Sequence, residues 1–136
     1  MKIAPEALGR LHDHAVEGYP HEVCGILAGE RSSGEVTRAE ALVNERADSP
    51  HNRYRVSGLT LMRAERALES QGLEIVGYYH SHPDHPADYS ETDREEALPN
   101  MDYLITAIHK GAVTDTKVWR LRDDRSAMDP IDLELK

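Results

Sequence analysis

Two histidines, a serine and an aspartate follow one another closely in the stretches His80-Ser-His82 and Ser90-Glu-Thr-Asp93. The apolar residues 73–79 before them are typical of a strand, in which side chains two apart share one side and sit roughly 7 Å apart. The two imidazoles can therefore close on one metal ion. Imidazole nitrogen suits zinc, and the aspartate carboxylate is a third ligand type that leaves one tetrahedral position for water. An open position indicates a catalytic rather than a structural metal.

Each of these residues also has a structural interpretation. Ser90 followed by an acid at position 93 has the spacing of a helix N-cap and its capping box. His80 and His82 could be ordinary residues at the end of a strand. Capping and metal binding are compatible, because a helix start would hold Asp93 in place and its dipole favours a carboxylate there.

Glu22 is the candidate general base. A metal-bound water still needs a carboxylate that accepts its proton and passes it to a leaving amine. Glu22 precedes the short apolar run 23–29, so its carboxylate reaches the water if that run forms a strand beside the histidine-bearing one. The alternative is a solvated loop residue. The Ser90 hydroxyl has a second candidate role, as a donor to the oxyanion of a tetrahedral intermediate.

Composition narrows the class of protein. A chain of 136 residues with 39% hydrophobic and 30% charged residues suits a single globular domain spanning residues 1–136. The net charge of −9 argues against nucleic-acid binding as the main role and leaves a basic protein partner open. Neither a membrane span of roughly 18 apolar residues nor a signal peptide is recognisable, so we expect a cytoplasmic protein without membrane contact. The lone Cys24 excludes a disulfide framework or a cysteine-based zinc site within one chain.

Helical and strand patterns alternate along the chain. Helices are predicted at 4–17, at 59–71 with Ser57 as cap and Gly72 as terminator, and at about 91–98. Strands are predicted at 23–29 and 35–43, which form a hairpin, and at 54–56, 74–80, 103–108, 116–121 and 131–135, with a loop at 44–53. This order favours an α/β or α+β sandwich, in which helices cover one mixed central sheet.

The motif Glu22-Val-Cys-Gly-Ile-Leu, then His80-Ser-His82-Pro83, then seven residues and Ser90-x-x-Asp93 resembles the JAMM signature of the MPN-domain metalloproteases. The resemblance implies one catalytic Zn²⁺ bound by His80, His82 and Asp93, with Glu22 as general acid/base and Ser90 stabilising the oxyanion. It also implies a cytidine-deaminase-like α/β sandwich. The deaminase reaction is not implied, because the Pro-Cys-x-x-Cys ligand pair is missing.

Within the family, the chain is most similar to the bacterial stand-alone members, such as those that release cysteine from a sulfur-carrier protein. Residues 44–49 and the pair Tyr54-Arg55 are similar to that subgroup. The implied partner is a small ubiquitin-like or sulfur-carrier protein with a Gly-Gly C-terminus, whose tail lies beside a strand edge. The carrier, the choice between peptide and isopeptide bond, and the oligomeric state, with a homodimer as one alternative, stay open.

Three alternatives remain. A catalytically silent MPN scaffold for ubiquitin-like proteins would usually lack the ligand set that is complete here. The DNA-repair-associated branch has a similar histidine and Ser-x-x-Asp pattern but typically adds a helix-hairpin-helix region. A non-haem iron oxygenase also uses two histidines and a carboxylate, although with a different ligand order and an all-β barrel.

Overall fold

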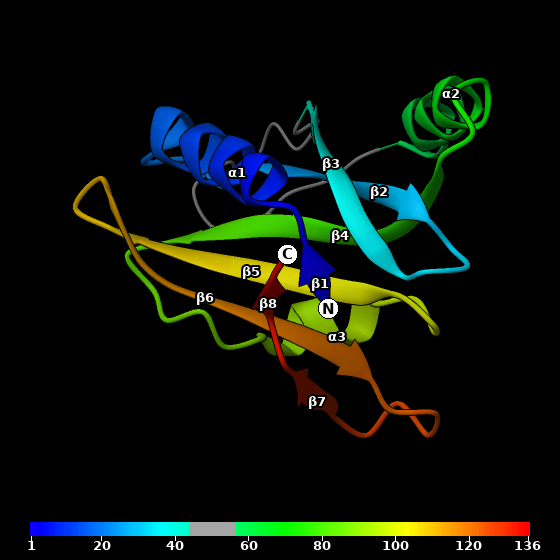
Figure 1. The fold of residues 1–136 in the computed structure, drawn as a ribbon. Helices are drawn as coiled ribbons and strands as arrows, with labels where there is room; N and C mark the ends of the chain where they lie inside the picture. Colours follow the sequence, from blue (N-terminus) through cyan, green and yellow to red (C-terminus); the bar gives the residue numbers. More distant parts are fainter. Residues whose placement is uncertain (44–56) are drawn as a thin grey trace.

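The computed structural model describes residues 1–43 and 57–136. Within these ranges, eight strands form one mixed sheet in the order β7-β6-β5-β4-β2-β3-β1-β8, accompanied by three helices (Figure 1). The strands are β1 (Lys2–Ile3), β2 (Cys24–Glu30), β3 (Glu35–Leu42), β4 (Glu74–Pro83), β5 (Asp102–His109), β6 (Ala112–Leu121), β7 (Met128–Ile131) and β8 (Glu134–Leu135). The helices are α1 (Pro5–Gly18), α2 (Gly58–Glu69) and α3 (Glu91–Glu96). The expected α/β fold with one mixed sheet is confirmed.

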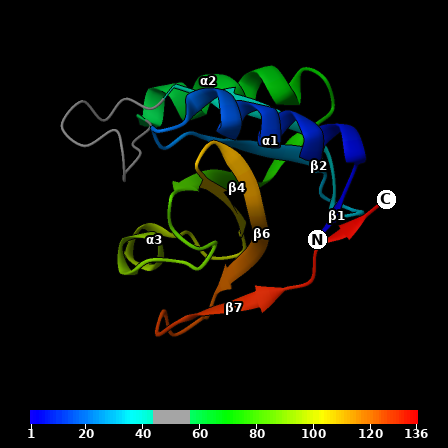
Figure 2. The ribbon, with the colours of Figure 1, turned by 90° about the vertical axis from the view of Figure 1, so that its left-hand side faces the viewer.

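Helices α1 and α2 cover opposite faces of β2. Leu11 of α1 packs in one core cluster with Leu27, whereas Leu68 of α2 packs in another with Ile26 and Ala28. Successive strand residues point to opposite faces, so these two clusters lie on the two sides of the sheet. The views in Figures 1 and 2 show α1 and α3 on opposite sides of β4. β2 and β4 are therefore interior strands, buried from both sides.

Several elements expected from the sequence are confirmed. Helix α1 begins at Pro5, where the missing N–H costs nothing. Helix α2 is capped by Ser57, whose Oγ accepts a hydrogen bond from the Thr60 amide at 3.2 Å. Gly72 has a φ of +74°, the left-handed conformation expected after this helix. The hairpin is the antiparallel pair β2 and β3.

The strand expected at 131–135 is wrong. β7 ends at Ile131 and pairs with β6, whereas β8 pairs with β1 at the other edge of the sheet. The period-two alternation cannot distinguish one strand from two pieces with different partners. The parallel β1–β8 pairing also places the two ends of the chain side by side (Figure 2). β1 was not predicted, because two residues are too short to carry a pattern.

Other boundaries shift for local reasons. β4 continues through Pro83 instead of ending at His80. Helix α3 ends at residue 96 rather than 98, because Leu98 precedes Pro99 and the residue before proline disfavours helical geometry. The expected loop at 44–53, the strand at 54–56 and the subgroup-like residues 44–49 and 54–55 lie outside the described residues. Among the described helices, none is long and apolar enough to cross a membrane.

Candidate metal centre

β4 brings the two histidines together. It lies between β2 and β5, with His80 opposite Cys24 on one side and beside Ile105 on the other. Because β4 stays extended through Pro83, His80 and His82 point to the same face, and their Nε2 atoms are 3.2 Å apart. The His80 side chain is only 1% exposed and that of His82 is 12% exposed. The pair is thus held in a largely buried setting.

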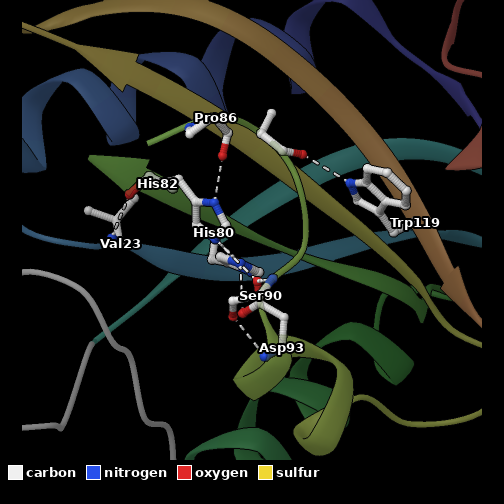
Figure 3. A network of polar contacts seen from close by, with 9 residues as sticks. Val23, His80, His82, Pro86, Ser90, Asp93 and Trp119 are labelled. Atoms are coloured by element: carbon white, nitrogen blue, oxygen red, sulfur yellow. Dashed lines mark hydrogen bonds and ion pairs between the residues drawn. The ribbon is translucent and has the colours of Figure 1, made fainter. Parts of the chain in front are cut away.

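Helix α3 brings the aspartate to the histidines. Ser90 Oγ accepts a hydrogen bond from the Asp93 amide at 3.0 Å, and Asp93 Oδ2 accepts one from the Ser90 amide at 2.9 Å. This reciprocal pair is the expected capping box. The same carboxylate places Oδ1 3.2 Å from His80 Nε2 and Oδ2 3.2 Å from His82 Nε2 (Figure 3). Capping and approach to the histidines therefore coexist in Asp93.

The donor set fits a metal ion. The contacts among the two Nε2 atoms and the Asp93 carboxylate are each 3.2 Å. Ligands at 2.0–2.2 Å around a tetrahedral zinc ion are separated by about 3.3 Å. Two imidazoles and one carboxylate leave the fourth corner of such a tetrahedron open. Spacing and chemistry both match one ion with room for a water.

The pairing of β2 with β4 places Glu22 at the same site. Cys24 lies opposite His80 in this antiparallel pair. The next pair consists of Val23, one residue before Cys24, and Ser81, one residue after His80. The Val23 amide donates to Ser81 Oγ at 2.9 Å, and the Ser81 amide donates to the Val23 carbonyl at 3.0 Å. This register sets Glu22 opposite His82, and directly opposed residues of antiparallel strands share a face. Among the described residues, Glu22, His80 and His82 form a group whose donor atoms lie within 4.8 Å of one another.

The surroundings of the site shift the pKa values of Asp93 and His82. Glu22 is only 5% exposed. Burial by itself would raise the pKa of the Asp93 carboxyl, but hydrogen bonds from His80 and His82 hold that pKa well below its usual range. Burial would lower the pKa of the His82 imidazole, whereas the hydrogen bonds to Asp93 and to the Pro86 carbonyl raise it. The carboxylate is therefore ionised and its charge attracts a cation to the same corner.

Some contacts at this site were not anticipated from the sequence. Ser81, between the two histidines, is fully buried and binds the Glu22-bearing segment from the opposite face of β4. The Tyr19 hydroxyl donates to Asp84 Oδ2 at 2.6 Å, and thereby joins the loop before Glu22 to the loop after His82. The position of Ser81, a polar residue inside an apolar strand, was a local sequence signal for its contact. The sequence contains no comparable signal for the Tyr19–Asp84 contact.

Comparison with known proteins shows the family. The family described as prokaryotic homologs of the JAB domain matches residues 4–122. The chain is 38% identical over 110 residues to a desampylase from Haloferax volcanii, covering 77% of this chain and 78% of that protein. It is 27% identical over 134 residues to a CysO-cysteine peptidase from Mycobacterium bovis, covering 98% and 90%. The solution structure of a protein from Salinibacter ruber, 36% identical, superposes with a TM-score of 0.78 and covers 100% of this chain and 92% of that one. The expected resemblance to the JAMM/MPN proteins is thus confirmed at the level of the family, and the chain belongs to the prokaryotic JAB-domain family.

Proposed function

We propose that this protein is a zinc-dependent peptidase that hydrolyses the bond after the Gly-Gly tail of a ubiquitin-like or sulfur-carrier protein. The observation that carries this proposal is the convergence of a buried acid, Glu22, on the corner formed by His80, His82 and Asp93. A silent scaffold has no need to bring two imidazoles and two carboxylates together at one place. We take residues 1–136 as a single domain that carries the whole site.

Each residue has a distinct role in the proposed reaction. His80, His82 and Asp93 bind the zinc, which supplies a water of lowered pKa and a polarised scissile carbonyl. Glu22 takes the proton of the attacking water and delivers it to the departing amine. Ser90 Oγ accepts a hydrogen bond from the Asp93 amide, and a hydroxyl that accepts in this way can still donate its own hydrogen. That hydrogen stabilises the oxyanion that forms on the substrate.

The similar proteins support the proposed substrate class. One of the relatives is named a desampylase and the other a CysO-cysteine peptidase, and these names support a conjugate of a small carrier protein as the substrate. A flexible Gly-Gly tail suits a buried site of this kind, because residues without side chains can approach the ion in an extended conformation. The leaving group is then either cysteine or the lysine amine of a conjugated protein, and both are amines that Glu22 can protonate.

The test is hydrolysis followed by intact mass. Zinc-loaded protein is incubated with a small Gly-Gly-ended carrier extended by cysteine, and separately with the same carrier joined to a lysine side chain. A carrier whose tail ends in Ala-Ala serves as the substrate control, and Glu22→Gln serves as the enzyme control. We expect release of the carrier from one or both Gly-Gly substrates, no release from the Ala-Ala carrier, and a rate for Glu22→Gln lower by about 10² to 10⁴.

Two results would contradict the proposal. One is the absence of hydrolysis by protein that demonstrably contains one zinc per chain, which would favour the silent scaffold. The other is near-native turnover by Glu22→Gln, which would remove the general base from its assigned role. Oxygen uptake with a 2-oxoacid, or tight DNA binding at moderate salt, would instead revive the oxygenase or the DNA-repair alternative.

A further inference from the structure

The His82 ring forms a hydrogen bond with a backbone carbonyl on the side away from the proposed metal. Its Nδ1 atom lies 2.8 Å from the Pro86 carbonyl oxygen. A carbonyl oxygen can only accept, so Nδ1 carries the hydrogen. Nε2, which faces His80 and Asp93, is then the nitrogen left to bind an ion; in the protonated imidazole the same atom donates to Asp93 Oδ2. The Pro86 contact therefore selects the tautomer and the ring orientation that a metal requires.

The Pro86 carbonyl belongs to a loop, so its position depends on other contacts of the loop backbone. Residues 84–90 connect β4 to α3 without regular secondary structure. The next carbonyl along, that of Ala87, accepts a hydrogen bond from Trp119 Nε1 at 3.0 Å. Figure 3 shows His82 and Trp119 on opposite sides of this loop, so the two successive carbonyls accept hydrogen bonds from opposite directions.

Trp119 is itself firmly placed. It lies on β6, which is paired with β5 on one side and β7 on the other. Its ring packs edge-on against Tyr89, with centroids 5.0 Å apart. Ala87 is fully buried in a cluster with Ile105, and both rings pack against this cluster. The indole N–H is thus a donor that cannot easily move, and it points at a loop carbonyl that has no strand partner.

We infer that Trp119, the single tryptophan of the chain, is a positioning residue for metal binding. By holding the Ala87 carbonyl it fixes the preceding peptide, so that the Pro86 carbonyl accepts from His82 Nδ1 and leaves Nε2 for the ion. The inference rests on the proposed function where it takes His82 as a ligand. Its structural part, the coupling of Trp119 to the hydrogen bond between His82 Nδ1 and the Pro86 carbonyl, is tested without any metal.

The test compares Trp119→Phe with the wild type. Phenylalanine keeps a ring against Tyr89 but lacks the N–H donor. In metal-free protein, nitrogen-detected NMR of the histidine rings should show the His82 Nδ1–H hydrogen-bonded to the Pro86 carbonyl in the wild type, and a weaker hydrogen bond or partial loss of the Nδ1–H signal in the variant. Chelator competition should show zinc affinity lower by about tenfold, at the lower end of what loss of an outer contact to a ligand costs.

Two further variants separate positioning from general destabilisation. Val118→Ala, one residue earlier on β6, removes a side chain that is buried in the cluster containing α1 residues and not in the one containing Ala87; its zinc affinity should stay within about twofold of wild type. Replacing Trp119 by benzothienylalanine exchanges the N–H for sulfur at nearly constant shape. This variant should reproduce the tenfold loss, and it keeps the test valid if Trp119→Phe does not fold.

The outcomes are separable. Wild-type zinc affinity together with an unchanged His82 Nδ1–H signal in the benzothienylalanine variant would overturn the inference. So would an equal loss of affinity in Val118→Ala, because the effect would then follow stability alone. If the wild-type protein binds no zinc, the proposed function fails, and the NMR comparison in metal-free protein still decides whether Trp119 supports the hydrogen bond between His82 Nδ1 and the Pro86 carbonyl.

Discussion

Removal of the Ser81 hydroxyl tests how the fold places the general base. Ser81 is fully buried and its Oγ accepts the Val23 amide hydrogen at 2.9 Å. Ser81→Ala leaves that N–H buried without its acceptor, which costs about 1–3 kcal/mol. With roughly 4 °C of unfolding midpoint per kcal/mol for a domain of this size, we expect the midpoint of the metal-free protein to fall by about 4–12 °C.

The same substitution should slow catalysis without releasing the metal. The Ser81 amide still donates to the Val23 carbonyl, so the segment that carries Glu22 stays near β4 but loses one of the two hydrogen bonds between Val23 and Ser81. A displacement of about 1 Å costs up to about 100-fold in rate, so kcat should fall by about 10- to 100-fold. Zinc affinity should change by less than about twofold, because His80 and His82 point away from Ser81 on the other face of the strand.

The assay combines thermal unfolding, zinc titration against a chelator and steady-state hydrolysis. Thr106→Val is the matched control: Thr106 is fully buried beside Ser81 on β5, and its Oγ1 forms a 2.8 Å hydrogen bond with Thr116. Its loss should destabilise the protein with kcat unchanged. If Ser81→Ala loses stability but turns over at the wild-type rate, or if Thr106→Val loses as much rate, the hydrogen bond from Val23 to Ser81 does not place Glu22.

Three more substitutions probe the remaining parts of the site. His82→Ala should abolish stoichiometric zinc binding, measured by elemental mass spectrometry after gel filtration; about one zinc per chain would contradict its role. Ser90→Ala removes the cap of α3, worth about 1 kcal/mol, together with the proposed oxyanion donor, so kcat should drop by about 10² to 10³ with KM little changed; an unchanged kcat would leave only the cap. Arg125 donates to the Ala97 carbonyl at 3.1 Å and so supports the far end of α3. Arg125→Ala should weaken zinc binding by about tenfold, whereas Arg122→Ala in the same loop should not, and equal effects of the two would argue against this support.

Local rules explain what could be predicted. The i, i+2 spacing of His80 and His82 in an extended run places both on one side of a strand whatever the strand pairs with. The Ser-x-x-Asp spacing specifies a capped helix start through contacts within four residues. Helix α2 and the β2–β3 hairpin follow in the same way from short-range patterns. These are the features in which sequence and structure agree.

Very short strands and the pairing of strands that are distant in the sequence could not be predicted. β1 is too short to show a period, and the alternation of residues 131–135 was divided between strands at opposite edges of the sheet. Strand partners are chosen by contacts between distant residues, and such contacts leave no trace in the neighbouring sequence. Even the exact end of β4, three residues beyond the first histidine of the motif, depended on its continued pairing with β5.

The amino-acid sequence by itself determined the chemistry of the proposed site: two imidazoles, two carboxylates and a hydroxyl, with the spacing of a known motif. Only the tertiary structure decided that these groups meet. Glu22 reaches His82 because β2 lies against β4, through a contact between Val23 and Ser81 that are 58 positions apart. Trp119 reaches Ala87 across 32 positions. Residue type sets what a side chain can do, but its distance to a partner depends on how the whole sheet is assembled.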